Sequence, residues 1–170
     1  MNSFEEVNSP DEMGWTPLHE AARSGTLSTF VKISERLSNK NPSDQRGITP
    51  LHVAASNGHY ELCKLILEAA DSKNPSNGAG WTPLHDAAKN GHLKICQLII
   101  DSVDDKNPGN VEGYTPLHDA ATSGHLEVCQ LIAKNVIDKR PMSAHGETPL
   151  RLAKVEGHAK VVEFLTQFKL

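Results

Sequence analysis

Residues 80–91 read Gly-Trp-Thr-Pro-Leu-His-Asp-Ala-Ala-Lys-Asn-Gly, and versions of this stretch recur along the chain. A fifth, degenerate copy reads Thr-Pro-Leu-Arg from Thr148, and each copy starts 33 residues after the one before. The central Thr-Pro-Leu-His begins at Thr16, Thr49, Thr82 and Thr115. A fixed period of this length is typical of repeat proteins, in which each unit stacks on its neighbours.

The repeated stretch predicts a short helix. The hydroxyl of Thr82 suits an N-cap, and Pro83 at the first helical position loses no amide hydrogen bond. Leu84 and the alanines at 87–88 follow at i, i+3 and i+4, which places them on one apolar face. Gly91 is expected to end the helix, because a left-handed residue is favoured there.

A second helix is predicted after each of these glycines. Helical spacing relates Leu93, Cys96, Ile99 and Ile100, and the next repeat has Leu126, Cys129, Ile132 and Ala133 at the same positions. We expect Asn107-Pro108-Gly109-Asn110 to form the turn of a hairpin-like loop before the next repeat. One unit cannot bury its apolar face alone, whereas stacked copies can.

The period and the pattern Gly-x-Thr-Pro-Leu-His-x-Ala-Ala-x-x-Gly resemble the ankyrin repeat, and the resemblance covers Gly14 to Leu170. It implies an all-α fold, an ankyrin-repeat solenoid of helix-turn-helix units joined by β-hairpin-like loops. We expect an N-terminal arm over residues 1–13 and a single repeat domain over residues 14–170. The expected repeats are residues 14–46, 47–79, 80–112, 113–145 and 146–170.

The chain departs from the family pattern after the second helix. Ankyrin repeats commonly carry Gly-Ala-Asp-Val-Asn there, but apolar residues stand at the position of that glycine. They are Leu37, Ala70, Val103 and Val136. We expect the helix to continue a residue further and these side chains to add to the core.

The terminal repeats replace apolar residues with polar ones. Lys32 and Ser34 do so in the first repeat, and Arg151, Lys154 and Lys169 make the last repeat polar. These replacements fit the wet outer face that a terminal repeat needs.

Nine histidines and three cysteines raise the question of a metal site. Eight histidines fall in two columns, meaning equivalent positions in successive repeats: His19, His52, His85 and His118, then His59, His92, His125 and His158. Such positions are expected to lie about 10 Å apart, whereas zinc holds its ligands at about 2.3 Å. We therefore expect loop-bracing hydrogen bonds, no metal and no cofactor.

The cysteines recur once per repeat, at Cys63, Cys96 and Cys129, and Phe30 and Val162 complete their column. A position that accepts Phe, Cys or Val is typical of a core, so we expect buried thiols without a disulfide. The sequence holds no Gly-rich phosphate loop, paired-carboxylate cleft or nucleophile elbow. We predict no catalytic residue and no enzymatic activity.

Asn41, Asn74 and Asn107 match the loop asparagine that an oxygenase hydroxylates in some ankyrin proteins. The resemblance makes them candidate modification sites. We favour the alternative, a turn asparagine that satisfies its own backbone.

Function is expected at positions that the repeat pattern leaves free. The position between Gly and Thr carries Trp15, Ile48, Trp81 and Tyr114, which include both tryptophans. The resemblance implies that this position faces a concave groove, where aromatic residues dominate binding energy. The alternative is that the rings pack on adjacent loops and only stiffen the array.

The first helix offers a second candidate surface, because the positions after His and after Ala-Ala share one face. The resemblance implies that this face also contacts partners. The candidates are Glu20, Arg23, Asn57, Asp86, Lys89, Asn90, Asp119 and Ser123, with Arg46 on the preceding loop. Their mild acidic bias suits a basic or mixed-polarity peptide with apolar anchors, and the alternative is a solvated helix face.

Composition bears on the partner and the compartment. The chain has 17 Lys and Arg against 21 Asp and Glu, a net charge of −4 that provides no surplus for phosphate contacts. No run approaches the roughly 18 apolar residues of a membrane span, and the N-terminus lacks a signal-peptide pattern. We expect a monomer that binds another protein, without nucleic acid or membrane, in the cytoplasm, with the nucleus as the alternative compartment.

The predicted function is therefore a non-catalytic protein-binding module that docks a partner in its concave groove. Two alternatives stay open. The chain is an inhibitory or regulatory subunit of an enzyme or transcription factor, or it is a spacer array from a longer protein.

Overall fold

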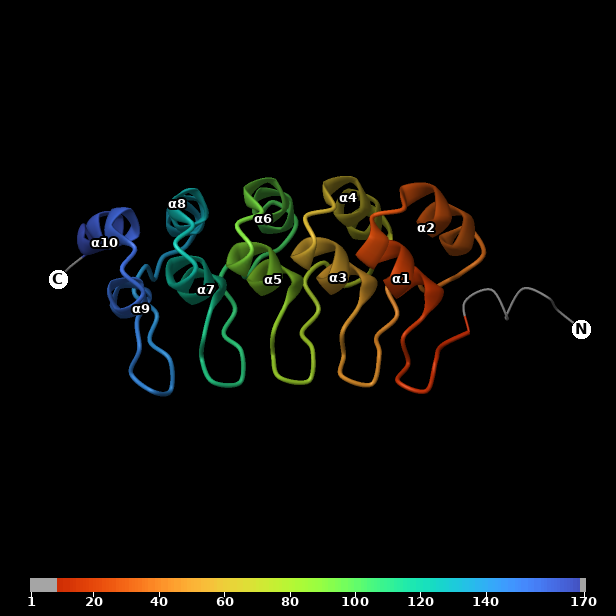
Figure 1. Ribbon diagram of the computed structural model, residues 1–170, viewed down its shortest axis with the longest axis horizontal. Helices are drawn as coiled ribbons and strands as arrows, with labels where there is room; N and C mark the ends of the chain where they lie inside the picture. Colours follow the sequence, from red (N-terminus) through yellow and green to blue (C-terminus); the bar gives the residue numbers. More distant parts are fainter. Residues whose placement is uncertain (1–8, 169–170) are drawn as a thin grey trace, which may run out of the picture.

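The computed structural model describes residues 9–168 and forms ten helices without a strand in that range, which confirms the expected all-α solenoid. The first helices are α1 (Pro17–Ser24), α3 (Pro50–Ser56), α5 (Pro83–Lys89), α7 (Pro116–Thr122) and α9 (Pro149–Val155). The second helices are α2 (Leu27–Ser34), α4 (Tyr60–Ala69), α6 (Leu93–Ile100), α8 (Leu126–Asn135) and α10 (Ala159–Thr166). Each helix packs on its counterparts in the adjacent repeats, so the helices form two rows (Figure 1).

Long hairpin-like loops, here called fingers, project from the row of first helices (Figure 1). Of the predicted arm at 1–13, residues 1–8 lie outside the described residues, as does Lys169. A turn begins at Asp11. The Gly14 N–H donates to the Asp11 carbonyl at 3.0 Å, and the Asp11 N–H donates to the Trp15 carbonyl at 2.9 Å, as in the turns of the later fingers. The part of the arm from Asp11 onward is therefore a finger.

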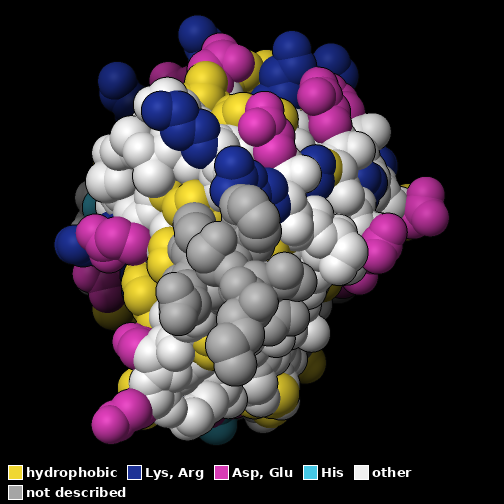
Figure 2. Space-filling model, turned by 90° about the vertical axis from the view of Figure 1, so that its right-hand side faces the viewer, with side chains coloured by type: hydrophobic (Ala, Val, Ile, Leu, Met, Phe, Trp, Pro, Cys, Tyr) yellow, Lys and Arg dark blue, Asp and Glu magenta, His cyan; other side chains and the backbone are white. Residues whose placement is uncertain are grey.

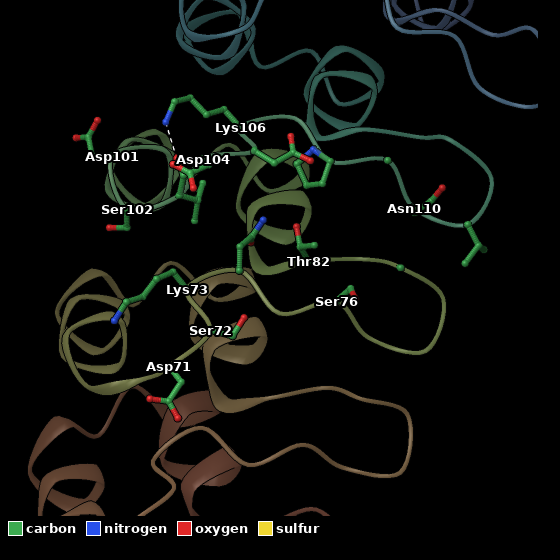
Figure 3. A pocket seen from close by; sticks show the side chains of 17 residues that line it. Asp71, Ser72, Lys73, Ser76, Thr82, Asp101, Ser102, Asp104, Lys106 and Asn110 are labelled. Atoms are coloured by element: carbon green, nitrogen blue, oxygen red, sulfur yellow. Dashed lines mark hydrogen bonds between the residues drawn. The ribbon is translucent and has the colours of Figure 1, made fainter.

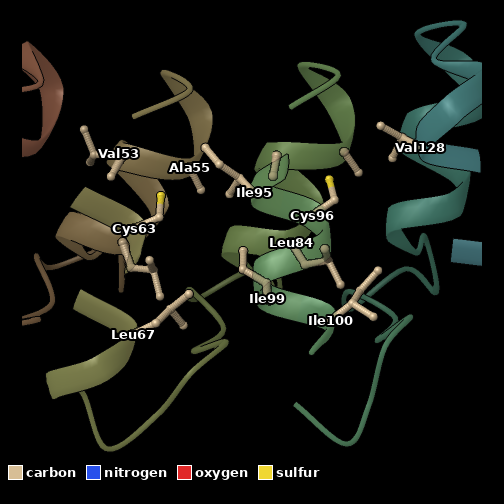
Figure 4. Packing of buried hydrophobic residues seen from close by; sticks show 14 of the residues in the cluster. Val53, Ala55, Cys63, Leu67, Leu84, Ile95, Cys96, Ile99, Ile100 and Val128 are labelled. Atoms are coloured by element: carbon tan, nitrogen blue, oxygen red, sulfur yellow. The ribbon is translucent and has the colours of Figure 1, made fainter. Parts of the chain in front are cut away.

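The core lies between the two rows (Figure 4). Leu84 and the alanines at 87–88 are fully buried, as predicted. The three cysteines are also fully buried, and burial raises the pKa of each thiol to about 12. Their predicted role as core residues is confirmed. Leu93, the first residue of α6, is 40% exposed, so the apolar face of that helix begins at Ile95 instead.

The second helices end before the apolar column that was expected to extend them. α4 ends one residue before Ala70, and α6 ends at Ile100, three residues before Val103. The Lys106 ammonium group donates to the Ile100 carbonyl at 2.7 Å and to the Val103 carbonyl at 2.6 Å, so it caps carbonyls that further helix would have bonded. The second half of the prediction is confirmed, because the four side chains pack against the core: Leu37, Ala70, Val103 and Val136.

The turn of the finger lies three residues later than predicted, at Asn110–Gly113. The Gly113 N–H donates to the Asn110 carbonyl at 2.9 Å, and the Asn110 side-chain oxygen accepts the N–H groups of Glu112 and Tyr114 at 2.9 Å. The same side-chain bonds are made at Asp11, Asp44, Asn77 and Ser143. These five turn residues lie 33 residues apart in the sequence, but their spacing alone does not predict that their side chains bond the turn.

The side chain of Asn107 therefore does not bond the backbone of a turn of its own. Its side-chain oxygen accepts the N–H of Leu117 at 3.0 Å, ten residues further on, and thereby caps the start of α7. Asn41 and Asn74 bond Leu51 and Leu84 in the same way. The three asparagines tie the fingers before α3, α5 and α7 to those helices.

The expected polar outer face holds with one exception. Lys32 is exposed, and so are Arg151 and Lys154 in the last repeat. Ser34 is buried, and its hydroxyl is satisfied by donating to the Val31 carbonyl of its own helix at 3.1 Å. The end of the array at α2 shows acidic and basic side chains interspersed in the helical layer (Figure 2). Over the described residues, no helix has both the length and the apolar character needed to cross a membrane.

In the first four repeats, the glycine that follows the first helix is held in a left-handed conformation beside a histidine of the next repeat. Gly91 has φ +72°, and a Cβ added there would lie 2.6 Å from the His125 ring. An L-residue at this position therefore meets both backbone strain and a clash.

We predict that Gly91→Ala destabilises the array by about 2 kcal/mol, because alanine is strained at positive φ and displaces the His125 ring. Urea unfolding followed by circular dichroism measures this change. Gly109→Ala is the matched control, since its nearest contact would be 3.5 Å from Gly113 Cα. Equal effects of the two substitutions would contradict the prediction.

Candidate functional site

The first histidine column connects each repeat to the finger of the next. The Nδ1 atom of His85 accepts the N–H of Thr82 at 3.1 Å, and its Nε2 atom lies 3.0 Å from the Tyr114 carbonyl oxygen. Because a carbonyl only accepts, the ring proton lies on Nε2 and the imidazole is neutral. The same geometry joins His19 to Ile48, His52 to Trp81 and His118 to Glu147.

The second histidine column points back to the preceding repeat. Nε2 of His125 bonds the Lys89 carbonyl at the end of α5 at 3.1 Å, and its ring lies against Gly91. His59, His92 and His158 do the same with Arg23, Ser56 and Thr122. The predicted loop-bracing role is confirmed and extends across repeat boundaries.

Burial keeps the first histidine column neutral. Loss of water lowers the pKa of His52 and His85 to about 4, and the hydrogen bond to the carbonyl of the next finger only partly opposes this effect. Protonation would place a second N–H on Nδ1, facing the N–H of the preceding threonine. The repeat junction therefore favours the neutral ring.

We predict that His85→Leu destabilises the array by about 2–4 kcal/mol at pH 7, because leucine removes both the donor to the next finger and the acceptor for the Thr82 N–H. The unfolded histidine binds its proton near pH 6.5 and the folded one only near pH 4, so this contribution is complete above pH 6.5 and disappears as pH falls towards 4. Urea unfolding at pH 7 and at pH 4.5 measures the difference between the two proteins. An equal difference at both pH values would contradict this explanation.

The four large residues at the pattern-free position lie on successive fingers and are all half-buried: Trp15, Ile48, Trp81 and Tyr114. Each aromatic ring contacts the histidine of its own repeat. The ring centroids are 4.7 Å apart for Trp15 and His19, 5.1 Å for Trp81 and His85, and 5.5 Å for Tyr114 and His118. The rings therefore pack within the array and also keep part of their surface in solvent.

The polar candidates on the first helices divide by their contacts. Glu20 and Arg23 are exposed and form an ion pair at 2.7 Å. The amides of Asn57 and Asn90 donate to carbonyls of their own helices, at Val53 and Asp86. The remaining candidates include exposed Lys89 and Arg46, half-buried Ser123, and the two aspartates Asp86 and Asp119.

Among the carboxyl groups of residues 9–168, those of Asp86 and Asp119 have the most strongly raised pKa values. Burial raises the pKa of Asp86 to about 7 and that of Asp119 to about 8. The Lys89 charge opposes this shift at both carboxyls, and the Asp86 charge increases it at Asp119. Ionisation of either carboxyl therefore lowers the free energy of unfolding.

We predict that Asp119→Asn raises the melting temperature by about 3 °C or more at pH 9 and changes it little at pH 5. The folded carboxyl binds its proton up to about pH 8 and the unfolded one only up to about pH 4, so its cost to stability grows between these values. Calorimetry of both proteins across this range tests the prediction. A lower melting temperature for the variant at pH 9 would show that the charged carboxylate stabilises the fold.

A polar cavity of about 900 Å³ lies between the loops that follow α4 and α6, and no repeat motif predicts it (Figure 3). Asp71, Ser72 and Asp101 line it together with Lys73 and Lys106. Both lysine ammonium groups bond carbonyls at the ends of the second helices. Among the described residues, no group of three His, Cys, Asp or Glu side chains is placed to hold a metal ion.

The fold and these surfaces define a helical repeat array whose histidines and asparagines hold neighbouring units together. A family model described as ankyrin repeats in three copies matches residues 30–110, 55–143 and 102–169. The chain belongs to the ankyrin repeat family, whose members generally act as protein–protein interaction modules. A search of curated proteins found no matching relative.

Proposed function

We propose that this chain is a non-catalytic module that docks another protein in a groove formed by the fingers and the first helices. The binding surface comprises the finger residues Trp15, Ile48, Trp81 and Tyr114 and the polar first-helix candidates. The observation that carries the proposal is that the large residues at the pattern-free position are only half-buried. Aromatic residues at such positions are typical of interface hot spots.

The backbone of each of these finger residues is held firmly. The Trp81 N–H donates to the Asn77 side chain at 3.0 Å, and the Trp81 carbonyl accepts from the Asn77 N–H at 2.8 Å and lies 3.1 Å from His52 Nε2. A side chain on a fixed backbone loses little conformational entropy when it binds, which favours affinity.

Neighbouring fingers are also linked directly. The Gly78 N–H donates to the Arg46 carbonyl at 2.8 Å, and the Val111 N–H donates to the Ala79 carbonyl at 3.1 Å. These bonds fix the spacing of the finger residues, so several anchors can meet one partner at once without reordering the loops.

The polar residues around the fingers would set register and selectivity. Arg46 and Lys89 are exposed, and rim charges act mainly on association rate and on the choice of partner. The net charge of −4 gives the chain no cationic surplus for phosphate contacts, so we propose a protein rather than a nucleic acid as its partner. The proposed binding form is a cytoplasmic monomer.

We predict that the triple substitution of Trp15, Trp81 and Tyr114 by Ala lowers partner affinity at least about 100-fold, because it removes the aromatic contact area. A lysate pull-down with the wild-type chain identifies the retained proteins, and titration calorimetry of one such protein then measures the loss. Helical circular dichroism verifies that the variant is folded.

The matched control replaces Leu27, Leu93 and Ile137 by Ala, since these apolar side chains are exposed away from the fingers. It should retain the partner. Capture of the same proteins by the wild type and by the aromatic variant would contradict the proposed surface, and no specific capture by either would favour the spacer alternative.

A further inference from the structure

One buried oxygen atom on the first-helix face has no hydrogen-bond partner. Asp119 is 9% exposed, and within residues 9–168 its Oδ2 is the single buried side-chain nitrogen or oxygen that lacks a bond. A buried acceptor without a partner costs free energy, and native structures contain few of them. Such an atom at a surface proposed to bind protein points to a donor that a partner supplies.

The charges around Asp119 indicate the charge of that donor. Asp119 lies on α7, which packs against α5 and α9. From α5, the charges of Asp86 and Lys89 act on its carboxyl, while α9 has the apolar residue Leu152 at the equivalent position. Lys89 is exposed, and neither of the ion pairs formed by the described residues includes it or Asp119. The site thus holds two carboxyls without a cation bonded to them.

The flanking positions of this column are aliphatic. The column begins at Glu20 and continues through Val53, Asp86 and Asp119 to Leu152, so the acidic pair lies between two apolar residues. Glu20 is already paired with Arg23. A segment that crosses these helices therefore meets one unpaired acidic place for a positive charge, between Val53, which is 7% exposed, and half-buried Leu152.

We propose that Asp119, with Asp86 beside it, receives a lysine or arginine side chain from an extended segment of the partner protein. This inference rests on the proposed function and specifies the chemistry of the partner. The cation donates to the carboxylate oxygens, and an apolar residue beside it in the segment contacts half-buried Leu152. Charge-assisted hydrogen bonds of this kind are about twice as strong as neutral ones.

Binding of the cation is coupled to proton release. In the free protein, burial holds the pKa of Asp119 at about 8, so the carboxyl is mostly protonated at pH 7. A cation beside it favours the carboxylate and lowers this pKa. Affinity for the cation therefore rises with pH between 6 and 8, by about tenfold or more.

The probe for this site is N-acetyl-arginine amide, which carries one positive charge and no carboxylate. N-acetyl-citrulline amide is the uncharged control of nearly the same shape. Carbon-13 NMR of the side-chain carboxyls in the full chain follows the Asp119 titration with each compound. We expect the arginine compound to lower the Asp119 pKa saturably, with tighter binding at pH 8 than at pH 6, and the citrulline compound to leave it unchanged.

Two variants locate the effect. With binding followed on the carboxyl signal of Asp86 in every protein, Asp119→Asn should reduce binding of the arginine compound at least about fivefold. Glu127→Gln, which removes an exposed acid of the same repeat on α8, should not change it. Equal responses to the two compounds in the wild type would overturn the inference without any variant. Unchanged binding by a folded Asp119→Asn protein would overturn it as well.

Failure of this inference is distinct from failure of the proposed function. If the arginine compound leaves Asp119 unaffected but the aromatic variant loses the partner, the binding surface stands and its cationic contact is wrong. If the compound binds but the aromatic variant still captures every partner, the cation site stands and the finger surface is wrong.

Discussion

The whole array depends on one buried, uncharged imidazole in each of the first four repeats. His85 accepts a hydrogen bond from Thr82 at the start of its own helix and donates one to Tyr114 in the next finger. The ring can do both only as the neutral Nε2–H tautomer, which burial favours by lowering the pKa. Local helix capping and contact between repeats are therefore the same interaction, so a repeat that forms also orders its neighbour.

This constraint connects the fold to the binding surface. The carbonyls that the histidines hold belong to Ile48, Trp81, Tyr114 and Glu147, the residues at the pattern-free position of the next repeat. The histidine bonds that hold the repeats together therefore also fix the backbone of the residues whose side chains the repeat pattern does not dictate. Asp86 and Asp119 act in the opposite sense to the histidines, because loss of water raises the pKa of each carboxyl and so favours its protonated form. Ionisation of these two carboxyls lowers the stability of the folded protein, so stability does not explain their presence on this surface.

The fold could be predicted almost completely from the sequence, because a strict period places equivalent residues in equivalent environments. Helix ends and turns were less predictable: the Lys106 cap and the Asn110 turn depend on side-chain geometry that spacing alone does not reveal. Trp81 and Asp119 could be selected as candidates, since the repeat pattern does not dictate them. The burial of Asp119 and its unbonded oxygen could not, because both depend on how closely α5, α7 and α9 pack.

The most direct test of the central claim is nitrogen-15 NMR of the His85 imidazole as a function of pH. A neutral ring with its proton on Nε2 gives distinct shifts for its two nitrogens, and burial predicts that this state persists down to about pH 4. Observation of that tautomer with a pKa near 4 would establish the neutral bridge between repeats. A pKa near 6.5, or a proton on Nδ1 at neutral pH, would contradict it.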